Sequence, residues 1–454
     1  MTRLALVAAV FAAACGDNGA APCGGDGQAH VCDGTLVGSD GRALVLRGVN
    51  FAGSHKMSPY TDPFGPADFT RLRTWGFQVV RYVVPWAAIE PSPGTYDDAY
   101  LDGIAMRAEW AQQAGIQVVV DLHQDVFGEG FGFDGAPAWA CDASRYAAFK
   151  PMAEWQLDYT DPNVEACFDS FYDPTSDANA RFVAMWSHVA DRLASEPAIL
   201  GFDPLNEPSW GSYNISTFER DRLQPFYDRV IAAVRAKAPR WIVFAEPSGS
   251  RNLGVATSLQ PFSEPDVVYA PHLYDGPAES TGMFQPSDRD DVLANADALR
   301  SEASRLGTAL WIGEYGGQGT DPGIGSYMAA DYDGAAAGSA GTAYWAFGDG
   351  GGYDLLDPDG SEVAPLLDAV VVPAPSRVAG ALTAWSYDRD AHALTIGWTP
   401  DASGLATVVL APARAFPNGA AVACAACSKV SIDGDEISLS APAGAAATAT
   451  ITAK

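Results

Sequence analysis

The chain has few positive charges. It contains 27 lysine and arginine residues against 56 aspartate and glutamate residues, which gives a formal net charge of −29 at pH 7. Such a surface repels the phosphates of nucleic acids and the head groups of anionic lipids, so we expect neither as a partner. With 48% hydrophobic and 18% charged residues, the composition is otherwise that of a globular protein.

Long hydrophobic runs are also missing, apart from one short stretch at the N-terminus. After Arg3, the apolar stretch from Leu4 to Ala14 is too short for a permanent bilayer-spanning helix and is typical of an export signal. Cys15 follows small residues, which predicts a lipoprotein with its lipid on Cys15 and a possible membrane association. Because Ala12 stands where leucine is usual, cleavage after Ala14 by an ordinary signal peptidase is an open alternative. Either way, we expect an exported protein, held at the cell surface or secreted.

Without Cys15, six cysteines remain, and an even number in an exported protein predicts disulfides. The simplest arrangement joins neighbours in the sequence, although the sequence allows other pairings. The expected pairs are Cys23–Cys32, Cys141–Cys167 and Cys424–Cys427. The spacing of the last pair also fits a redox site or half of a zinc site, but no second Cys/His pair lies nearby, which favours a structural disulfide.

The chain divides into four expected segments. Residues 1–15 form the signal, 16–42 a linker and small hairpin, 43–370 a barrel and 371–454 a small β-sandwich. In the third segment, apolar runs alternate with helical patterns, which predicts a parallel sheet closed into a (β/α)8 TIM barrel, an α/β fold. The expected strands are 43–50, 79–84, 116–123, 199–206, 241–246, 267–272, 309–314 and 342–347. The loops 124–178 and 273–289 are long, and short strands separated by Pro, Gly and Asp predict the sandwich.

Two glutamates carry the chemical prediction. Glu207 follows one apolar run and Glu314 ends another. In a (β/α)8 barrel, the C-terminal ends of the strands carry the active site. Two carboxyl groups there are the machinery of a retaining glycosidase, with Glu207 as acid/base and Glu314 as nucleophile. Asn206, beside Glu207, is suited to hydrogen-bond a sugar hydroxyl.

Other polar and aromatic residues at strand ends are candidate supports. We expect Arg81 to keep Glu314 ionised, His272 to tune the proton of the acid, Tyr274 to hold the nucleophile, and Trp345 to stack under a sugar ring. Each has a structural alternative: an ion pair for Arg81, a buried core position for His272, and barrel packing for Trp345. No cofactor or metal is expected, because no cluster has ligand spacing.

The order of these motifs resembles glycoside hydrolase family 5, and more narrowly the endoglycoceramidases. The wider resemblance rests on Arg81, His123, Asn206-Glu207-Pro208, His272-x-Tyr274, Glu314 and Trp345. The narrower one rests on residues 47–50 (RGVN), 83–91 with Gly94 and Tyr96, 121–125 (DLHQD) and 135–140 (GAPAWA). It covers roughly residues 43–370, and the sandwich fits the same layout.

The resemblance implies a glycosphingolipid substrate, cleaved between the first sugar and ceramide. It implies that Lys56 and Asp125 bind hydroxyls of that sugar. An apolar cleft is expected for the lipid, and its candidate lining is Phe127, Phe131, Phe133, Trp139, Met283 and Phe284, which could equally be loop core. Similar sequences act on glucose-linked lipids, galactose-linked lipids or sterol glucosides, and the lysine retained at position 56 favours glycosphingolipids.

Three rival functions stay open at this point. An endo-β-glucanase or mannanase would show an open cleft with aromatic platforms instead of a lipid channel. A steryl-β-glucosidase belongs to the same family, and a non-catalytic carbohydrate-binding protein is disfavoured by the intact glutamate pair. The sandwich is expected to brace the barrel, although binding of sugar or membrane is an alternative, and the protein is expected to be a monomer.

Overall fold

The computed structural model describes residues 27–454, except residues 337 and 349. The expected signal segment, Cys15 and Cys23, and with it the proposed Cys23–Cys32 pair, lie outside the described residues. Within the described part of the chain, no helix combines the length and apolarity needed to cross a membrane.

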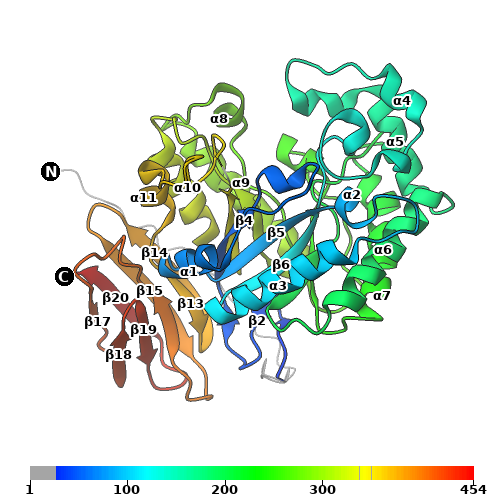
Figure 1. The fold of residues 1–454 in the computed structure, drawn as a ribbon. Coiled ribbons are helices and arrows are strands. Elements are labelled where there is room, and N and C mark those ends of the chain that lie inside the picture. Colours follow the sequence, from blue (N-terminus) through cyan, green and yellow to red (C-terminus); the bar gives the residue numbers. More distant parts are fainter. Residues whose placement is uncertain (1–26, 337, 349) are drawn as a thin grey trace.

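The centre of the molecule is a closed parallel barrel (Figure 1). The sheet runs in the order β10-β9-β8-β7-β6-β5-β4-β12-β11, and its two end strands, β10 and β11, are the halves of one strand interrupted at Trp311. The ring therefore has eight strands, as predicted. They are β4 (Leu46–Phe51), β5 (Val79–Pro85), β6 (Gln117–His123), β7 (Ile199–Asp203), β8 (Ile242–Ala245), β9 (Val267–Tyr269), β10 (Ala309–Leu310) with β11 (Ile312–Tyr315), and β12 (Gly341–Phe347).

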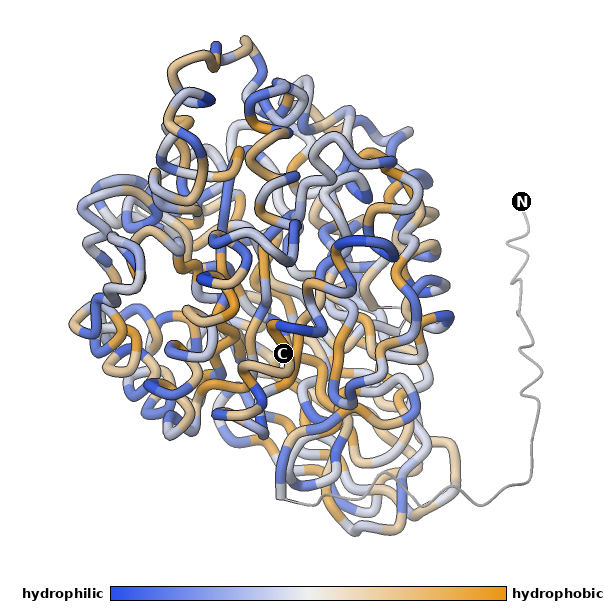
Figure 2. Tube along the Cα trace, turned by 90° about the vertical axis from the view of Figure 1, so that its right-hand side faces the viewer, coloured by the Kyte–Doolittle hydropathy of each residue, from blue (hydrophilic) through white to orange (hydrophobic). Residues whose placement is uncertain are grey.

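Helices cover the outside of the barrel. In α6, apolar residues recur at helical spacing from Phe182 to Leu193, and the Ser176 side chain caps the helix by accepting from the Asn179 amide. The helices of this layer are α1 (Pro66–Thr74), α2 (Trp86–Ile89), α3 (Asp98–Ala114), α6 (Asp177–Leu193), α7 (Gln224–Arg235) after the π-helical turn η5 (Glu219–Leu223), α9 (Arg289–Leu306), α10 (Ile324–Ala336) and α11 (Ala364–Val370). Figure 2 shows the apolar segments concentrated between these layers.

The barrel interior changes from apolar to polar along the strands. Side chains of a strand alternate between its faces, so residues two apart share a face. Val79 is buried in the apolar floor and Arg81 lies one layer higher; Val119 and Asp121 are related in the same way, as are Phe244 and Glu246. The apolar floor thus supports a polar layer near the C-terminal ends of the strands.

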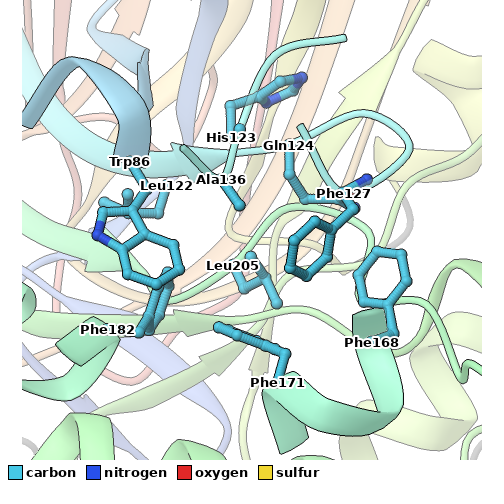
Figure 3. Close-up of a pocket in the computed structure, with 11 residues that line it drawn as sticks. Trp86, Leu122, His123, Gln124, Phe127, Ala136, Phe168, Phe171, Phe182 and Leu205 are labelled. Atoms are coloured by element: carbon cyan, nitrogen blue, oxygen red, sulfur yellow. The ribbon is translucent and has the colours of Figure 1, made fainter. Parts of the chain in front are cut away.

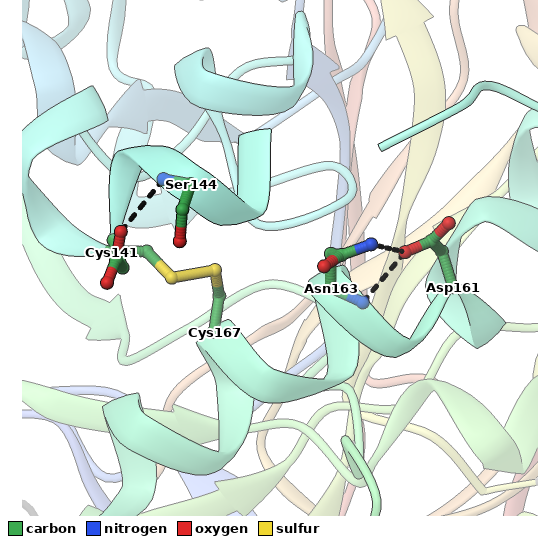
Figure 4. The surroundings of a disulfide bond; sticks show 6 residues. Cys141, Ser144, Asp161, Asn163 and Cys167 are labelled. Carbon is green, nitrogen blue, oxygen red and sulfur yellow. Dashed lines mark hydrogen bonds between the residues drawn. A yellow bond between two sulfur atoms is a disulfide. The ribbon is translucent and has the colours of Figure 1, made fainter. Parts of the chain in front are cut away.

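The loop after β6 is long but structured. It contains η2 (Glu129–Phe131), η3 (Ala138–Ala140), α4 (Ala143–Ala148), η4 (Trp155–Thr160) and α5 (Pro162–Tyr172). The predicted Cys141–Cys167 disulfide joins the segment between η3 and α4 to α5 (Figure 4). Cys424–Cys427 is also formed. Shorter elements follow other strands: η1 (Ser54–Lys56), η6 (Gly249–Leu253) and α8 (Gly276–Thr281).

Two antiparallel sheets at the C-terminal end pack around a second core, as expected for a sandwich. One sheet has the order β14-β15-β20-β17 and the other β1-β2-β3-β13-β16-β19-β18. Both contribute to one buried cluster, which includes Trp385, Ile396, Val409 and Ile437. Their bounds are β1 (His30–Cys32), β2 (Thr35–Val37), β3 (Ala43–Leu44), β13 (Ala374–Val378), β14 (Gly380–Asp388), β15 (Ala393–Pro400), β16 (Thr407–Leu410), β17 (Ala420–Ala423), β18 (Lys429–Asp433), β19 (Glu436–Ser440) and β20 (Ala447–Ala453).

One predicted strand was wrong at its start. Ala43 and Leu44 do not belong to the first barrel strand but form β3, which pairs with β2 and with β13. The chain changes sheets at Val45, whose side chain packs in the second core, whereas Leu44 and Leu46 on either side pack in the barrel floor. The N-terminal hairpin is therefore built into the same sheet as the C-terminal strands.

Candidate active site

Arg81 is the centre of the polar layer. It is the third residue of β5, inside the barrel, and not at the strand end where we expected it. Its Nη1 donates to Glu314 Oε1 at 2.7 Å and its Nη2 to Glu246 Oε1 at 2.6 Å. Asp121 and Asp203 lie 2.9 and 3.1 Å from Nη2. Burial opposes the charge of Arg81, but these four carboxyl groups outweigh it and raise its pKa.

The two predicted glutamates lie together above this arginine. One carboxylate oxygen of each, and a ring nitrogen of His272, lie within 4.8 Å of one another. His272 Nδ1 is 2.8 Å from Glu207 Oε1 and 3.5 Å from Glu314 Oε2. Glu207 follows β7 in a left-handed backbone conformation, with φ of 39°, which is strained for a residue other than glycine and turns it out of the strand direction.

Glu314 is held on both oxygens. Arg81 binds Oε1, and the Tyr274 hydroxyl donates to Oε2 at 2.9 Å. Burial raises the pKa of Glu314, while His272, Arg81 and the Tyr274 hydrogen bond act in the opposite direction. Arg81 therefore favours the ionised form, as expected, but does not by itself set the pKa of this carboxyl group.

His272 links the glutamates to Glu246. It lies beyond the end of β9 and pairs with Glu314 as an isolated bridge. Its Nε2 is 3.1 Å from Glu246 Oε1. Burial alone would lower the pKa of His272, but Glu246, Glu314 and the contact with Glu207 hold it well above the usual value. These contacts therefore favour the cationic form of the imidazole.

Two further side chains fix Glu207. The Glu246 carboxylate accepts the backbone N–H of Glu207 at 2.8 Å, and Asn252 Nδ2 donates to Glu207 Oε1 at 2.6 Å. Asn252 lies in η6, which is anchored by Arg251 Nε to Glu302 at 2.9 Å and by the Ser248 amide to Glu219 at 2.7 Å. The acid/base candidate is thus positioned by a preorganised loop as well as by its own strand.

Lys56 and Asp125 form a second polar group, beside Trp345. Lys56 Nζ is 2.8 Å from Asp125 and 3.4 Å from Asp134, and 5.1 Å above the Trp345 ring. The His123 ring stacks on Trp345 with centroids 5.2 Å apart. Burial lowers the pKa of His123, and the positive charges of Lys56 and Arg81 lower it further, so its imidazole is neutral.

Asn206 completes the set of predicted site residues. Its Oδ1 accepts from Arg81 Nη2 at 2.9 Å and its Nδ2 donates to the Gln124 carbonyl at 3.2 Å. All ten predicted residues therefore gather around one end of the barrel.

The expected lining of a lipid cleft is only partly exposed. Phe127, Phe131 and Phe284 are buried, with Phe284 stacked on Tyr327 at 4.8 Å, so these three belong to the loop core. Phe133 and Trp139 are half-buried, and Met283 is exposed. Phe127 instead borders an apolar cavity of about 20 Å³ behind His123, with walls that include Phe168, Phe171 and Phe182 (Figure 3). Such a volume suits a single small molecule and not a lipid chain.

Several site residues escaped prediction: Asp203, Glu246, Asn252 and Asp134, with Asp121 noted only as part of a motif. Glu246 directly follows β8. It ends the expected strand 241–246, as Glu314 ends the expected strand 309–314, and that position was the available signal. Asn252 reaches back from a loop, so nothing in the local pattern indicates it. The acidic groups around Asp134 and Asp121 have metal-like proximity, but Lys56 and Arg81 supply the cations they face.

Comparison with known families agrees with this geometry. Residues 38–351 match the cellulase model of glycosyl hydrolase family 5. The chain belongs to glycoside hydrolase family 5. Residues 373–452 match the C-terminal domain model of the same family. The protein is therefore a glycoside hydrolase with the family's barrel and C-terminal domain.

Relatives within family 5 narrow the resemblance. Endoglycoceramidase I of Rhodococcus hoagii (strain 103S) is 30% identical over 418 residues, covering 86% of this chain and 81% of that protein. The endo-glycoceramidase II structure from Rhodococcus sp. in complex with ganglioside GM3 is 29% identical, with a TM-score of 0.82 over 93% of this chain and 100% of that one. A lactosyl-enzyme intermediate of the same enzyme is 30% identical, with a TM-score of 0.80 over 92% and 99% of the two chains.

Proposed function

We propose that this family 5 hydrolase is a retaining endo-β-glycosidase that cleaves the bond between the oligosaccharide and ceramide of glycosphingolipids. The observation that carries the proposal is the Glu207–Glu314 pair, whose carboxylate oxygens approach within 4.8 Å. Retaining glycosidases hold their carboxyl groups about 5–5.5 Å apart, whereas inverting enzymes need a wider gap for water.

The first step forms a covalent intermediate. Protonated Glu207 gives its proton to the ceramide oxygen as Glu314 attacks the anomeric carbon, so the glycosidic bond breaks, ceramide leaves and a glycosyl ester forms on Glu314. Arg81 and Tyr274 hold the nucleophile on both oxygens. Because His272 and Asn252 both meet Oε1 of Glu207, the transferred proton is assigned to Oε2.

The second step releases the sugar. Glu207, now a carboxylate, takes a proton from water, and the resulting hydroxide attacks the anomeric carbon and frees Glu314. The cationic His272 and the Asn252 amide stabilise the carboxylate form of Glu207 between the two steps. The lactosyl-enzyme complex of the Rhodococcus enzyme supports a covalent route for this chain as well.

The sugar next to the bond is assigned to the space bounded by Trp345, Lys56 and Asp125. The Trp345 ring offers an apolar face, while the ammonium and carboxylate groups offer a donor and an acceptor for hydroxyls. The name of the R. hoagii relative and the GM3 complex support a glycosphingolipid as the molecule that presents this sugar.

The test is incubation of the purified protein with a ganglioside, glucosylceramide, galactosylceramide, a sterol glucoside and carboxymethyl-cellulose, with products identified by mass. Intact oligosaccharide and free ceramide are expected. Glu314→Gln should abolish this product. Glu207→Gln should retain kcat/KM on an aryl glycoside whose good leaving group needs no proton in the first step, while its kcat falls because the second step lacks the general base. Release from cellulose alone, or from the sterol glucoside alone, would contradict the proposal.

Export as a monomer, anchored through lipidated Cys15 or released after cleavage at Ala14, belongs to the same proposal. It rests on the N-terminal sequence pattern. Mass analysis of the mature N-terminus would identify a lipidated Cys15 or an N-terminus at that residue without lipid, while an intact Met1 terminus would contradict export by this signal. Light scattering of the mature protein would test the monomer.

A further inference from the structure

Exposed apolar side chains gather at the open end of the barrel. Ten large apolar side chains of the described residues are exposed, and seven of them belong to the barrel portion. Six of these seven lie in loops that follow barrel strands; we call them the apolar rim. The apolar rim consists of Met57 after β4, Met152, Trp155 and Leu157 after β6, Leu253 after β8, and Met283 after β9, with exposed fractions from 40% to 71%.

These six side chains share one face of the molecule. Parallel strands of a barrel end on the same side, so loops that follow them surround the same opening. Figure 1 shows the segments of α4 and α8 standing at the same end of the barrel, away from the N-terminal hairpin. Isolated exposed apolar residues are ordinary, but six from four different loops around one opening need an explanation.

We propose that the apolar rim docks the barrel mouth on the surface of a zwitterionic lipid bilayer. A bilayer accepts side chains from separate loops without requiring one continuous complementary surface. Tryptophan prefers the membrane interface, and methionine adapts to irregular apolar surroundings. Three of the six rim residues are methionines, although the whole chain has only seven.

Charge selects the kind of bilayer. The net charge of −29 opposes approach to an anionic leaflet. The segment 142–157 does not share this negative charge, because its two acidic residues, Asp142 and Glu154, are balanced by Arg145 and Lys150. The rim segment after β6 is therefore locally neutral, which suits insertion beside zwitterionic head groups.

The rim also connects to the catalytic pair. Trp155 lies 6.1 Å from Phe133 and 6.4 Å from Tyr159, ring to ring. The Tyr159 hydroxyl is 3.5 Å from Gln124, whose Nε2 donates to the Glu207 carbonyl at 3.1 Å. Trp155 is therefore connected through Tyr159 and Gln124 to the backbone of Glu207, the residue that protonates the leaving group in the proposed function. This link rests on the proposed function, whereas docking itself does not require it.

The test measures binding separately from catalysis. Full-length protein carrying Cys15→Ser, which removes lipidation, is floated with phosphatidylcholine vesicles that contain no glycolipid. Met152→Ser, Trp155→Ser and Leu157→Ser are then combined in that background. The matched control is Met106→Ser on α3, outside the rim, with 41% exposure. We expect the combined variant to lose vesicle partitioning by about tenfold or more and the control to match the parent.

Further arms separate the alternatives. Leu253→Ser, on another loop, should weaken partitioning about threefold even if the combined variant fails to fold. Phosphatidylserine vesicles should bind the parent more weakly than phosphatidylcholine. Equal partitioning of parent and rim variants, no partitioning, or binding to phosphatidylserine alone would overturn docking. Rim-dependent partitioning without ceramide release would uphold docking and refute the proposed function, whereas ceramide release from detergent micelles without vesicle partitioning would do the reverse.

Discussion

Replacement of Asn252 by alanine should selectively slow reactions that need a proton from Glu207. Asn252 Nδ2 donates to Glu207 Oε1 at 2.6 Å, and His272 Nδ1 meets the same oxygen at 2.8 Å. Hydrogen bonds to charged groups contribute about 1.5–3 kcal/mol. If that stabilisation developed only as Glu207 loses its proton, its loss would slow the reaction about 10- to 150-fold. Because the contact already exists before proton transfer and His272 remains, we expect about tenfold.

The assay compares kcat/KM on two substrates. A glycosphingolipid has a poor leaving group that must be protonated, whereas a 2,4-dinitrophenyl lactoside leaves without a proton. Asn252→Ala should lower kcat/KM for the first and leave the second within about twofold. Asn252→Asp should be worse, because it places a carboxylate against a carboxylate. The control is Asn214→Ala, which loses only a turn contact with the Ser216 amide on the surface.

An equal fall on both substrates would show that Asn252 merely supports the fold, and no fall on either would show that the contact is irrelevant to proton transfer. Both results would refute the assignment of Asn252 as a positioning residue. Thermal unfolding of each variant provides the check on folding.

Three other substitutions test separate parts of the structure. Glu246→Gln removes the carboxylate that most raises the pKa of His272, so the alkaline fall of kcat/KM should move to lower pH in a pH–rate profile. Cys141→Ser combined with Cys167→Ser removes the cross-link between residues 26 positions apart in the sequence. The chain-entropy relation gives a loss of about 3.5 kcal/mol in the free energy of unfolding. Protease cleavage within 142–160, or a lower unfolding midpoint, would measure this loss. Burial raises the pKa of Glu279 from 4.5 to about 7, so its contribution to stability is complete below pH 4.5 and is lost as pH rises through about 7. Glu279→Gln should therefore flatten the fall of the unfolding temperature between pH 4.5 and about 7.

The barrel was predictable because its signal is periodic. Buried parallel strands are continuous apolar runs, and their alternation with helices leaves few other folds. The error at Ala43 and Leu44 has a physical cause: an apolar strand residue reports burial but not the sheet that buries it. For Phe127, Phe131 and Phe284 the sequence left both a cleft lining and a loop core open for the same reason, and their burial favours the loop core.

The site was predictable where function sits at the end of a strand. Glu207, Glu314 and Tyr274 are close to such ends. Asp203 and Glu246 occupy similar positions but were read as parts of apolar runs. The role of Asn252 could not be predicted from the sequence, because its contact with Glu207 depends on the position of η6. That position is fixed by Glu302 and Glu219, which are distant in the sequence. A side-chain contact that depends on the tertiary structure cannot be predicted from the local sequence pattern.

The polar layer of the barrel also constrains how single substitutions are interpreted. Arg81 and His272 are its cations, and both face Glu246 and Glu314. Burial raises the pKa of Asp121 and of Asp203, while the positive charge of Arg81 lowers both. Removing one carboxylate therefore changes the protonation of its neighbours as well as its own contacts. The titration steps belong to the layer and not to one residue, so the effect of Glu246→Gln on catalysis includes the response of His272.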